Sequence, residues 1–553
     1  MMNEDVLLKK YILYTTDRVG GDFRYIFDNV LEIVTEISDI SQLVWDGQYP
    51  VILSGFDKSE AENYLVSIGK ERGKDYYLDE DFFGLLDDFS IPSDRRLAVW
   101  GTGRMADFLM TEDRELLPEC YIDSNRKQAV FNNKPVYLPD EIKDWREYYI
   151  IVAVAEDGEI RDRLEGLNLK EKEDYISFRD YLNRPSALLK KTIFDRNSYD
   201  LDCRTMLNHL EILWDGGTSC CCTTFMDERL GSVQEHSRDE IWNSIYHQIL
   251  CLSAINRTYT FCKKDMCPLF IGKNKSEKAT ERREYPRMPE TPRTLVLAYD
   301  DTCNLYCDTC REQMFVPDKM YREQMSRTTE TVLKDYLPEA EFMVLAGAGE
   351  VFASPSYREI FTSQECRNIK YIRLLSNGML FNEKNWESLV AGKHAKIMLT
   401  VSVDAASKET YESIRRGGNF DVLKKNMEYA ATLRRSGELS YFRMNFVVQR
   451  KNYREMPDFV RWGEELGCDE VFFTKILNWG TYSEEEFSGV SMMENDGATP
   501  KPELLSVMND PAMQSPIVDM GTIQALHKAD KADVVQNYYM WELEKRGGKL
   551  FKS

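Results

Sequence analysis

Three of the thirteen cysteines in this chain form a CxxxCxxC motif, at Cys303, Cys307 and Cys310. The motif directly follows the apolar segment TLVLAYD (294–300), which predicts a β-strand, so the three thiols lie on one short loop. Three thiolates on one loop can hold three irons of a [4Fe-4S] cubane and leave the fourth iron open to another ligand. The same spacing is also compatible with half of a zinc site.

A second group of cysteines precedes this motif, between residues 220 and 267. A cubane that is held by protein alone needs four thiolates, and we expect these to be Cys221, Cys222, Cys262 and Cys267. Cys220 is the alternate ligand, because three adjacent cysteines cannot all point the same way. Zinc is the rival metal, since four cysteines in a compact module also suit a closed tetrahedral site.

The other cysteines and the histidines show no such grouping. Cys251 falls in the apolar helical stretch IYHQILCLSAI, where a packed core thiol is expected. Cys120, Cys203, Cys366 and Cys468 are isolated, and we predict buried free thiols without a role. The five histidines are scattered singly, so a histidine-based metal site is not indicated.

From residue 293 the hydrophobic pattern alternates regularly between strands and amphipathic helices. Six strands are predicted, at 294–300, 341–347, 369–376, 395–404, 441–449 and 470–477. Six βα units in this length predict an α/β fold with a partial (β/α)6 TIM-type barrel. Its functional loops are then at the carboxyl ends of the strands, where the CxxxCxxC motif lies.

The motifs at these strand ends resemble those of the radical S-adenosylmethionine (SAM) superfamily, across roughly residues 293–480. In that family a glycine-rich GGE segment holds the SAM amino group, and later strand ends face the ribose and methionine of SAM. The cofactor-binding residues that the resemblance implies are Gly347, Ala348, Gly349, Glu350, Ser376, Asn377, Ser402, Asp404 and Arg416. Thr309 and Val351 depart from the family pattern, where an aromatic residue and a proline are common, and this leaves the adenine contacts open.

The resemblance implies an enzyme that uses a [4Fe-4S] cluster on Cys303, Cys307 and Cys310 to cleave SAM reductively. The resulting 5'-deoxyadenosyl radical would abstract hydrogen from a substrate, and flavodoxin or ferredoxin is the kind of reducing partner expected. The cysteines from 220 to 267 likewise resemble a SPASM or twitch module, which binds a further [4Fe-4S] cluster. That module usually follows the barrel, whereas here it precedes it.

The first 185 residues contain a faint internal repeat, in which 50–83 recurs in pattern as 148–182. The apolar strand predicted before Gly101 leads directly into a GxGxxA motif that begins at Gly101. Asp123 ends the next predicted strand. Gly101, Gly103 and Asp123 could hold a nucleotide, with phosphate at a helix N-terminus and the acid on a ribose hydroxyl. The alternative is a small Rossmann-like domain that serves in docking or regulation.

These patterns predict five regions. They are a Rossmann-like α/β unit (1–90), a second such unit with GxGxxA (91–185), the cluster module (200–271), the barrel (293–482), and an acidic loop with a C-terminal tail (483–553). The charged, proline-containing segment 272–292 predicts a linker that places the cluster module on a tether.

With 71 basic and 93 acidic residues the formal charge is −22, which disfavours nucleic acid and anionic membrane surfaces as partners. We expect a cytoplasmic protein, because the sequence has no apolar run of membrane-spanning length and no signal peptide at its start. The tandem Rossmann-like front favours a carbohydrate or glycan precursor as substrate. The alternatives are a peptide maturase of the RiPP type and a non-catalytic iron-sulfur sensor or scaffold.

Overall fold

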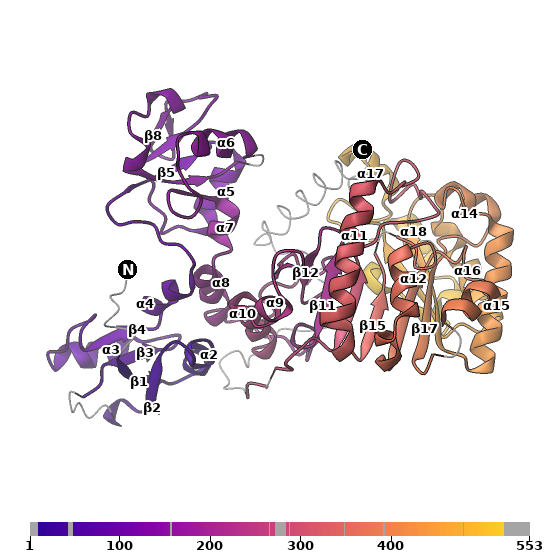
Figure 1. The fold of residues 1–553 in the computed structure, drawn as a ribbon, viewed down its shortest axis with the longest axis horizontal. Helices are drawn as coiled ribbons and strands as arrows, with labels where there is room; N and C mark the ends of the chain where they lie inside the picture. Colours follow the sequence, from indigo (N-terminus) through magenta and orange to yellow (C-terminus); the bar gives the residue numbers. More distant parts are fainter. Residues whose placement is uncertain are drawn as a thin grey trace. The chain divides into compact units, whose positions relative to one another are not determined.

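The computed structural model describes residues 9–42, 48–154, 157–264, 266–270, 284–286, 288–347, 349–390, 393–478 and 481–524 (Figure 1). The chain divides into two compact units. The first unit comprises residues 1–197, 248–260 and 278–285, and the second comprises residues 198–247, 261–277 and 286–553. The fold is mixed α/β with parallel sheets, as predicted. No described helix combines the length and hydropathy needed to cross a membrane.

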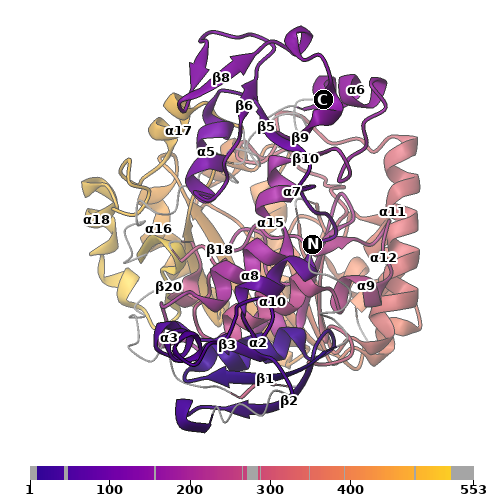
Figure 2. The same cartoon turned by 90° about the vertical axis from the view of Figure 1, so that its left-hand side faces the viewer.

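The first unit contains two sheets that share one arrangement of four parallel strands, to which the second sheet adds two more strands, the last of them antiparallel. The four-stranded sheet has the order β2-β1-β3-β4 and consists of β1 (Lys10–Thr15), β2 (Glu32–Ile37), β3 (Val51–Ser54) and β4 (Tyr76–Leu78). The six-stranded sheet has the order β10-β9-β5-β6-β8-β7 and consists of β5 (Arg96–Trp100), β6 (Cys120–Ile122), β7 (Val130–Phe131), β8 (Lys134–Tyr137), β9 (Tyr148–Val152) and β10 (Tyr175–Ser177). In both sheets the first strand is an interior strand: β1 lies between β2 and β3, and β5 lies between β6 and β9 (Figure 2).

The internal repeat matches these elements one by one. Residues 50–83 contain β3, α3 (Ser59–Ser67), β4 and α4 (Glu80–Phe83). Residues 148–182 contain β9, α6 (Gly158–Gly166), β10 and α7 (Phe178–Leu182), and α8 (Pro185–Ile193) follows. Each repeat places its apolar strand residues in a buried cluster of its own, around Leu53 in one sheet and Ile150 in the other.

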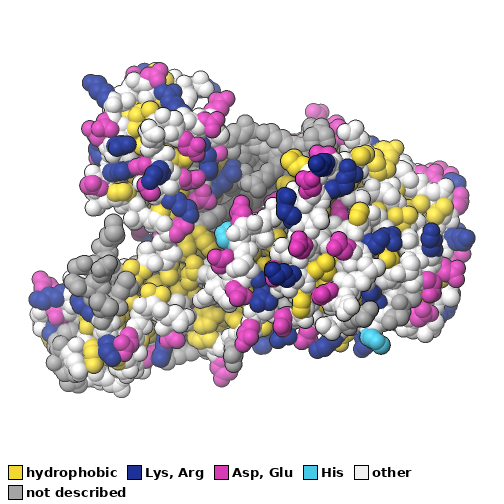
Figure 3. All heavy atoms as spheres, viewed as in Figure 1, with side chains coloured by type: hydrophobic (Ala, Val, Ile, Leu, Met, Phe, Trp, Pro, Cys, Tyr) yellow, Lys and Arg dark blue, Asp and Glu magenta, His cyan; other side chains and the backbone are white. Residues whose placement is uncertain are grey.

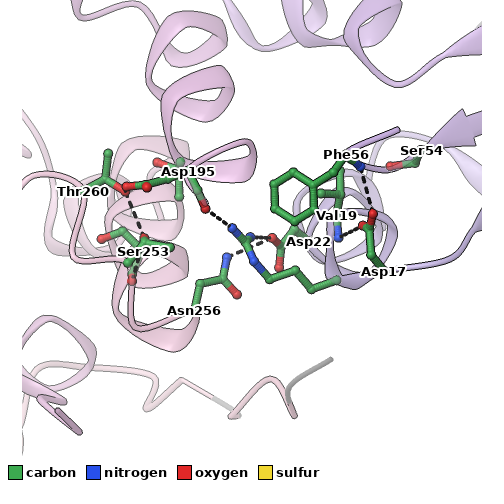
Figure 4. A network of polar contacts seen from close by, with 12 residues as sticks. Asp17, Val19, Asp22, Ser54, Phe56, Asp195, Ser253, Asn256 and Thr260 are labelled. Atoms are coloured by element: carbon green, nitrogen blue, oxygen red, sulfur yellow. Dashed lines mark hydrogen bonds and ion pairs between the residues drawn. The ribbon is translucent and has the colours of Figure 1, made fainter. Parts of the chain in front are cut away.

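A buried polar network joins distant segments of the first unit (Figure 4). The Arg18 guanidinium, at the start of α2 (Arg18–Phe27), pairs with Asp22 and donates to the Asp195 carbonyl. Asn256 and Tyr285 donate to the Asp22 carboxylate, over 2.8 and 2.7 Å. Burial raises the pKa of Asp22 to about 6, although its partners act in the opposite direction. These hydrogen bonds explain why residues near 256 and 285 belong to this unit.

The second unit is built on a ten-stranded sheet with the order β13-β12-β11-β14-β15-β16-β17-β18-β19-β20. Its strands are β11 (His209–Leu213), β12 (Gly217–Ser219), β13 (Gly231–Ser232), β14 (Thr294–Ala298), β15 (Phe342–Leu345), β16 (Tyr371–Ser376), β17 (Lys396–Ser402), β18 (Leu439–Val448), β19 (Glu470–Lys475) and β20 (Val518–Asp519). From β11 to β20 every pair is parallel. Five of the six predicted strand segments contain one of the strands β14 to β19, and the segment 441–449 overlaps β18, which begins two residues earlier.

Helices cover one face of this sheet. They are α11 (Lys319–Thr331), α12 (Pro355–Thr362), α14 (Lys408–Ile414), α15 (Phe420–Ser436) and α16 (Met456–Leu466) (Figure 1). Fully buried residues such as Ile372, Leu374 and Phe446 alternate along the strands. The Phe446 ring packs against Phe459 of α16, so this set of residues faces the helices. The residues between them lie on the opposite face, which we call the inner face.

Two expectations about the flanking segments were wrong. β11 lies within the cluster module and pairs with β14 over five residues, from His209–Thr294 to Leu213–Ala298. The module is therefore part of the main sheet and is not on a tether. In the predicted acidic loop, helices α17 (Glu484–Val490) and α18 (Pro502–Met508) and strand β20 form before residue 524. A capping box of Ser483 and Glu486 starts α17, and the sequence reading overlooked it. The rest of the predicted C-terminal tail, from residue 525 on, lies outside the described residues.

Close backbone contact explains one glycine of the GxGxxA motif. Gly101 has φ +128°, and a Cβ atom there would lie 2.4 Å from the Ala153 carbonyl oxygen at the end of β9. Gly103 caps α5 (Arg104–Glu112) at φ −102°, and a Cβ atom there would meet no atom within 4 Å. The fold therefore requires glycine at position 101 and not at position 103.

This difference predicts the effect of a matched pair of substitutions. Gly101→Ala should destabilise the β5–β9 contact by about 2 kcal/mol, because it combines a strained φ with a steric clash. Gly103→Ala should change stability by less than about 0.5 kcal/mol. Hydrogen exchange of the β5 and β9 amides in the full chain measures both effects. Equal exchange rates in the two variants would contradict the assignment.

Candidate functional site

The CxxxCxxC loop lies at the carboxyl end of β14, as predicted, and its thiols are held by N–H groups. Cys303 Sγ accepts hydrogen bonds from the Leu305 amide, over 3.4 Å, and from Asn377 Nδ2, over 3.7 Å. Cys307 Sγ accepts from Arg415 Nη1, over 3.7 Å. Burial raises the pKa of Cys303 to about 11. Because N–H donors and a nearby guanidinium stabilise negative sulfur, the loop is suited to thiolates once a metal compensates for burial.

The segment after α14 fixes the shape of this loop. Backbone hydrogen bonds run from the Tyr306 amide to the Arg416 carbonyl, over 3.1 Å, and from the Asp308 amide to the Ile414 carbonyl, over 3.0 Å. The Arg416 guanidinium donates to the carbonyls of Tyr306, Cys307 and Arg311, over 2.9, 3.5 and 2.6 Å. The Arg416 side chain thus links three backbone carbonyls of the cysteine loop and fixes their relative positions.

A buried ion pair lies beside the loop. Arg415 Nη2 is 2.6 Å from Asp404 Oδ2, and both side chains are largely buried. Asp404 follows β17 with φ +65°, and its Oδ1 accepts from the Val447 amide over 2.8 Å. Burial raises the pKa of Asp404, and the Arg415 charge opposes this shift. Arg415 Nε has no hydrogen-bond partner among the described residues.

Glu350 is fully buried between the ends of β15 and β16. Its carboxylate accepts from the Asn377 amide, the Ser376 hydroxyl and the Phe352 amide, over 2.6, 2.8 and 3.3 Å. Burial raises the pKa of Glu350, and these donors oppose the shift. The carboxylate therefore ties two strand ends together at the level of the cysteine loop.

The glycine-rich segment before Glu350 passes very close to β14. A Cβ atom at Gly347 would lie 3.1 Å from the Ala298 backbone, and one at Gly349 would lie 2.1 Å from the Asp300 carbonyl oxygen. Ala348 lies outside the described residues. Ser402 is the last residue of β17 and pairs with Asn445 of β18. Apart from Arg416, which follows α14, the described residues expected to bind SAM thus lie at the carboxyl ends of strands or in the loops that follow them.

The thiols of the cluster module are also neighbours. Burial raises the pKa of Cys221, and the charge of Cys262 raises it further. Burial likewise raises the pKa values of Cys222 and Cys262, and the charge of Cys267 adds to both shifts. Cys203, to which the sequence reading gave no role, is a charge neighbour of Cys221, Cys262 and Cys267. The β11–β12 hairpin brings Cys203 back to this group across seventeen intervening residues, which local spacing does not reveal.

The donor sets fit iron-sulfur clusters by their chemistry. The loop after β14 offers three thiols, enough for three irons of a cubane, and the module offers at least four. None of the thirteen cysteines forms a disulfide. Among the described residues, no three His, Cys, Asp or Glu side chains converge as ligands of a single metal ion. In a cubane each thiolate binds a different iron, so its ligands lie further apart than those of one ion.

Two further residues near these sites were not singled out from the sequence. Gln449 follows β18 and is fully buried, and its Oε1 and Nε2 have no hydrogen-bond partner among the described residues. Glu211 on β11 is buried beside Cys222 and accepts from the Thr223 amide over 3.0 Å. Burial raises the pKa of Glu211 to about 7. Glu211 is a single acid in an apolar strand, and Gln449 opens a charged loop, so neither belongs to a pattern that would reveal it.

The residues of the predicted nucleotide site lie together at the end of β5 and β6. The Thr102 hydroxyl donates to the Asp123 carboxylate, and the Asn125 amide donates to the other carboxylate oxygen over 2.8 Å. Gly101 and Gly103 flank Thr102 at the start of α5. In the structure Asp123 thus stabilises its own loop.

Comparison with known protein families identifies the cysteine-rich module. The iron-sulfur cluster-binding domain SPASM matches residues 203–268, which begin at Cys203 and end just after Cys267. The match covers the described cysteines of the module and places its first residue on the cysteine that the sequence reading missed.

Two curated proteins are similar to part of the chain. The PqqA peptide cyclase of Gluconobacter oxydans is 26% identical over 201 residues, which are 36% of this chain and 54% of that protein. The probable GTP 3',8-cyclase of Methanococcus maripaludis is 24% identical over 177 residues, which are 32% of this chain and 56% of that protein. The chain thus spans about half the length of these relatives.

Solved structures show a partial likeness. Streptococcus suis SuiB bound to S-adenosylmethionine is 16% identical, with a TM-score of 0.27 over 39% of this chain and 46% of SuiB. The enzyme anSMEcpe with bound AdoMet is 21% identical, with a TM-score of 0.26 over 34% of this chain and 52% of that chain.

The contacts of Arg416 generate a prediction about cluster loading. Arg416→Gln removes donors to the three carbonyls that shape the cysteine loop, and we expect the iron bound after anaerobic reconstitution to fall by at least a third. Arg435→Gln, on the exposed end of α15, is the control and should bind as much iron as the unaltered protein. Full iron loading in Arg416→Gln would show that the loop keeps its shape without this side chain.

Proposed function

We propose that this chain, a radical SAM protein whose SPASM module precedes β14 in the sequence, cleaves SAM reductively and abstracts a hydrogen atom from a substrate. The observation that carries the proposal is the CxxxCxxC loop at the end of β14, surrounded by Glu350, Asn377 and Asp404 at neighbouring strand ends. The main sheet would be the partial (β/α)6 barrel expected from the sequence.

The residues of the chain have distinct tasks in this proposal. Cys303, Cys307 and Cys310 would hold a [4Fe-4S] cluster, which supplies the electron that splits the sulfonium bond of SAM and yields a 5'-deoxyadenosyl radical. Arg416 keeps the three thiols in one geometry. Arg415 places a positive charge beside Cys307, which favours the thiolate.

The SAM contacts implied by the family resemblance remain proposals. Glu350 already accepts three hydrogen bonds, but a carboxylate has about four acceptor positions, so one remains for an ammonium group. Gly347 and Gly349 keep side chains out of the space beside β14. Ser376, Asn377, Ser402 and Arg416 would then face the remaining parts of the cofactor.

An auxiliary [4Fe-4S] cluster is proposed for the SPASM module, with ligands drawn from Cys203, Cys221, Cys222, Cys262 and Cys267. Burial raises the pKa values of Cys221 and Cys262 and the charge of Cys203 adds to both shifts, which supports including Cys203. Such a cluster could accept the electron left on the substrate after hydrogen abstraction or relay electrons from flavodoxin or ferredoxin. The five-region division of the chain and a nucleotide at Gly101, Gly103 and Asp123 are further proposals.

The substrate class has two candidates. The tandem Rossmann-like sheets favour a carbohydrate or glycan precursor. A peptide is the second candidate, because one curated relative is named as a peptide cyclase. On the face seen in Figure 3, acidic and basic side chains are interspersed, which suits neither nucleic acid nor an anionic membrane as partner.

The first prediction of this function concerns SAM cleavage. After anaerobic reconstitution and reduction with dithionite, the protein should release 5'-deoxyadenosine from SAM. The triple variant Cys303→Ala, Cys307→Ala, Cys310→Ala should release less than about 1% as much, because an enzyme without its cofactor retains no route to the radical. If the iron loads and no deoxyadenosine forms with or without candidate substrates, the sensor or scaffold alternative replaces the enzyme.

The second prediction concerns the auxiliary cluster. Two cubanes correspond to about eight irons per chain. Cys203→Ser should lower this to between four and six irons while the SAM-cleaving cluster stays intact. Cys120→Ala, in the core of the six-stranded sheet, is the control and should keep the full iron content. Unchanged iron in Cys203→Ser would exclude Cys203 as a ligand.

A further inference from the structure

Two arginines lie on the inner face of the main sheet. The residues on either side of each arginine in its strand face the helices instead. Arg373 stands between Ile372 and Leu374 on β16, and both of these are fully buried. Arg443 stands between Phe442 and Met444 on β18 in the same way. Strand alternation therefore directs both guanidinium groups away from the helices and onto the inner face.

Arg443 is fully engaged by its neighbours. Its Nη1 is 3.5 Å from Glu470 Oε1, its Nε donates to Asn445 Oδ1 over 2.7 Å, and its guanidinium lies 3.6 Å from the centroid of the Phe472 ring. Glu470 also accepts a hydrogen bond from the Tyr441 hydroxyl. Among the described residues, Glu470 is the only carboxylate that pairs with Arg443, and it is already shared with the Tyr441 hydroxyl.

Arg373 differs, because among the described residues it forms no ion pair. Its Nη2 lies 4.0 Å from Met398 Sδ, the residue opposite it on β17, and a thioether is a weak acceptor. Its Nε is buried without a hydrogen-bond partner in the described part of the chain. The charge of Arg373 also lowers the pKa of Arg443, so the two cations are close enough to repel each other.

The other carboxylates near this face do not neutralise Arg373. Asp519 on β20 is exposed and accepts from the Gly521 amide over 2.8 Å. Glu211 on β11 accepts from the Thr223 amide and lies three strands away from β16 in the sheet. A partly buried guanidinium without a counter-ion is costly, and a carboxylate that binds it in bidentate fashion offsets that cost.

We propose that Arg373 binds a carboxylate group of the substrate on the inner face of the main sheet. This rests on the proposed function, since it assigns the inner face to the substrate of SAM cleavage. Arg373 precedes Ser376 by three residues, so it lies about 10 Å along β16 from the strand end that faces the cysteine loop. That distance leaves room for a small substrate between its anchored carboxylate and the site of hydrogen abstraction.

A cavity of about 690 Å³ lies near the amino ends of β18 and β19, and Tyr441, Glu470 and Asp519 are among its lining residues. It offers space beside the same inner-face residues for the remainder of a larger substrate. A carboxylate can come from a sugar acid or from an acidic amino acid, and both share the chemistry that Arg373 recognises.

The test is equilibrium binding of matched probes to the reconstituted full-length protein with SAM. The acidic probes are glucuronate and N-acetylglutamate α-methylamide, and their neutral partners are glucose and N-acetylglutamine α-methylamide. We expect at least one acidic probe to bind tenfold more tightly than its neutral partner. Arg373→Met should abolish this preference, and Arg373→Lys should keep part of it. Arg461→Met, at an exposed arginine of α16, should leave it unchanged.

Each outcome decides one point. Preference for glucuronate assigns the carboxylate to a sugar acid, and preference for the glutamate probe assigns it to a peptide. Absence of any preference, or a preference that persists in a folded Arg373→Met protein with normal iron content, overturns the proposal. Release of 5'-deoxyadenosine is measured in parallel, with and without the probes. If SAM is cleaved but no carboxylate preference is found, only the role of Arg373 is contradicted. If a carboxylate preference is found but SAM is not cleaved, the proposed function is contradicted.

Discussion

The buried pair of Arg415 and Asp404 is the interaction on which the candidate site depends. Asp404 lies at the end of β17 and accepts from the Val447 amide of β18, and Arg415 donates to Cys307. One ion pair therefore connects two strand ends with the cysteine loop. Removing one partner of a buried pair typically costs about 3 to 5 kcal/mol, because the other charge is left uncompensated. The neighbouring Arg416 extends the same segment into three carbonyl contacts on that loop.

The cluster module gains its position from strand pairing. β11 pairs in parallel with β14, β12 and β13 extend the sheet beyond it, and the CxxxCxxC loop leaves the carboxyl end of β14. Because the module precedes β14 in the chain, a strand parallel to β14 is a geometrically simple way to attach it. The pairing of β11 with β14 thus attaches the module to the main sheet directly.

Periodicity and motif spacing predicted the parts of this structure that depend on local sequence. Strands β14 to β19 follow from apolar runs of the right length, and the CxxxCxxC loop follows from its place after such a run. Cys203 was missed because its neighbours lie far along the chain and meet it only through a hairpin. Arg373 gave no signal either, since a single arginine in an apolar strand shows its meaning only when the adjacent strands are known.

The two sheets of the first unit show how one topology can carry different loops. In the first sheet Asp17 accepts from the Val19 amide at the start of α2 and from the Phe56 amide after β3, over 2.9 and 2.8 Å. A negative side chain thus already compensates the N-terminal end of that helix. In the second sheet Gly103 stands at the equivalent position and has no side chain to do so. The nucleotide proposal therefore concerns the second sheet alone, because only there is the space at the helix start left to a ligand.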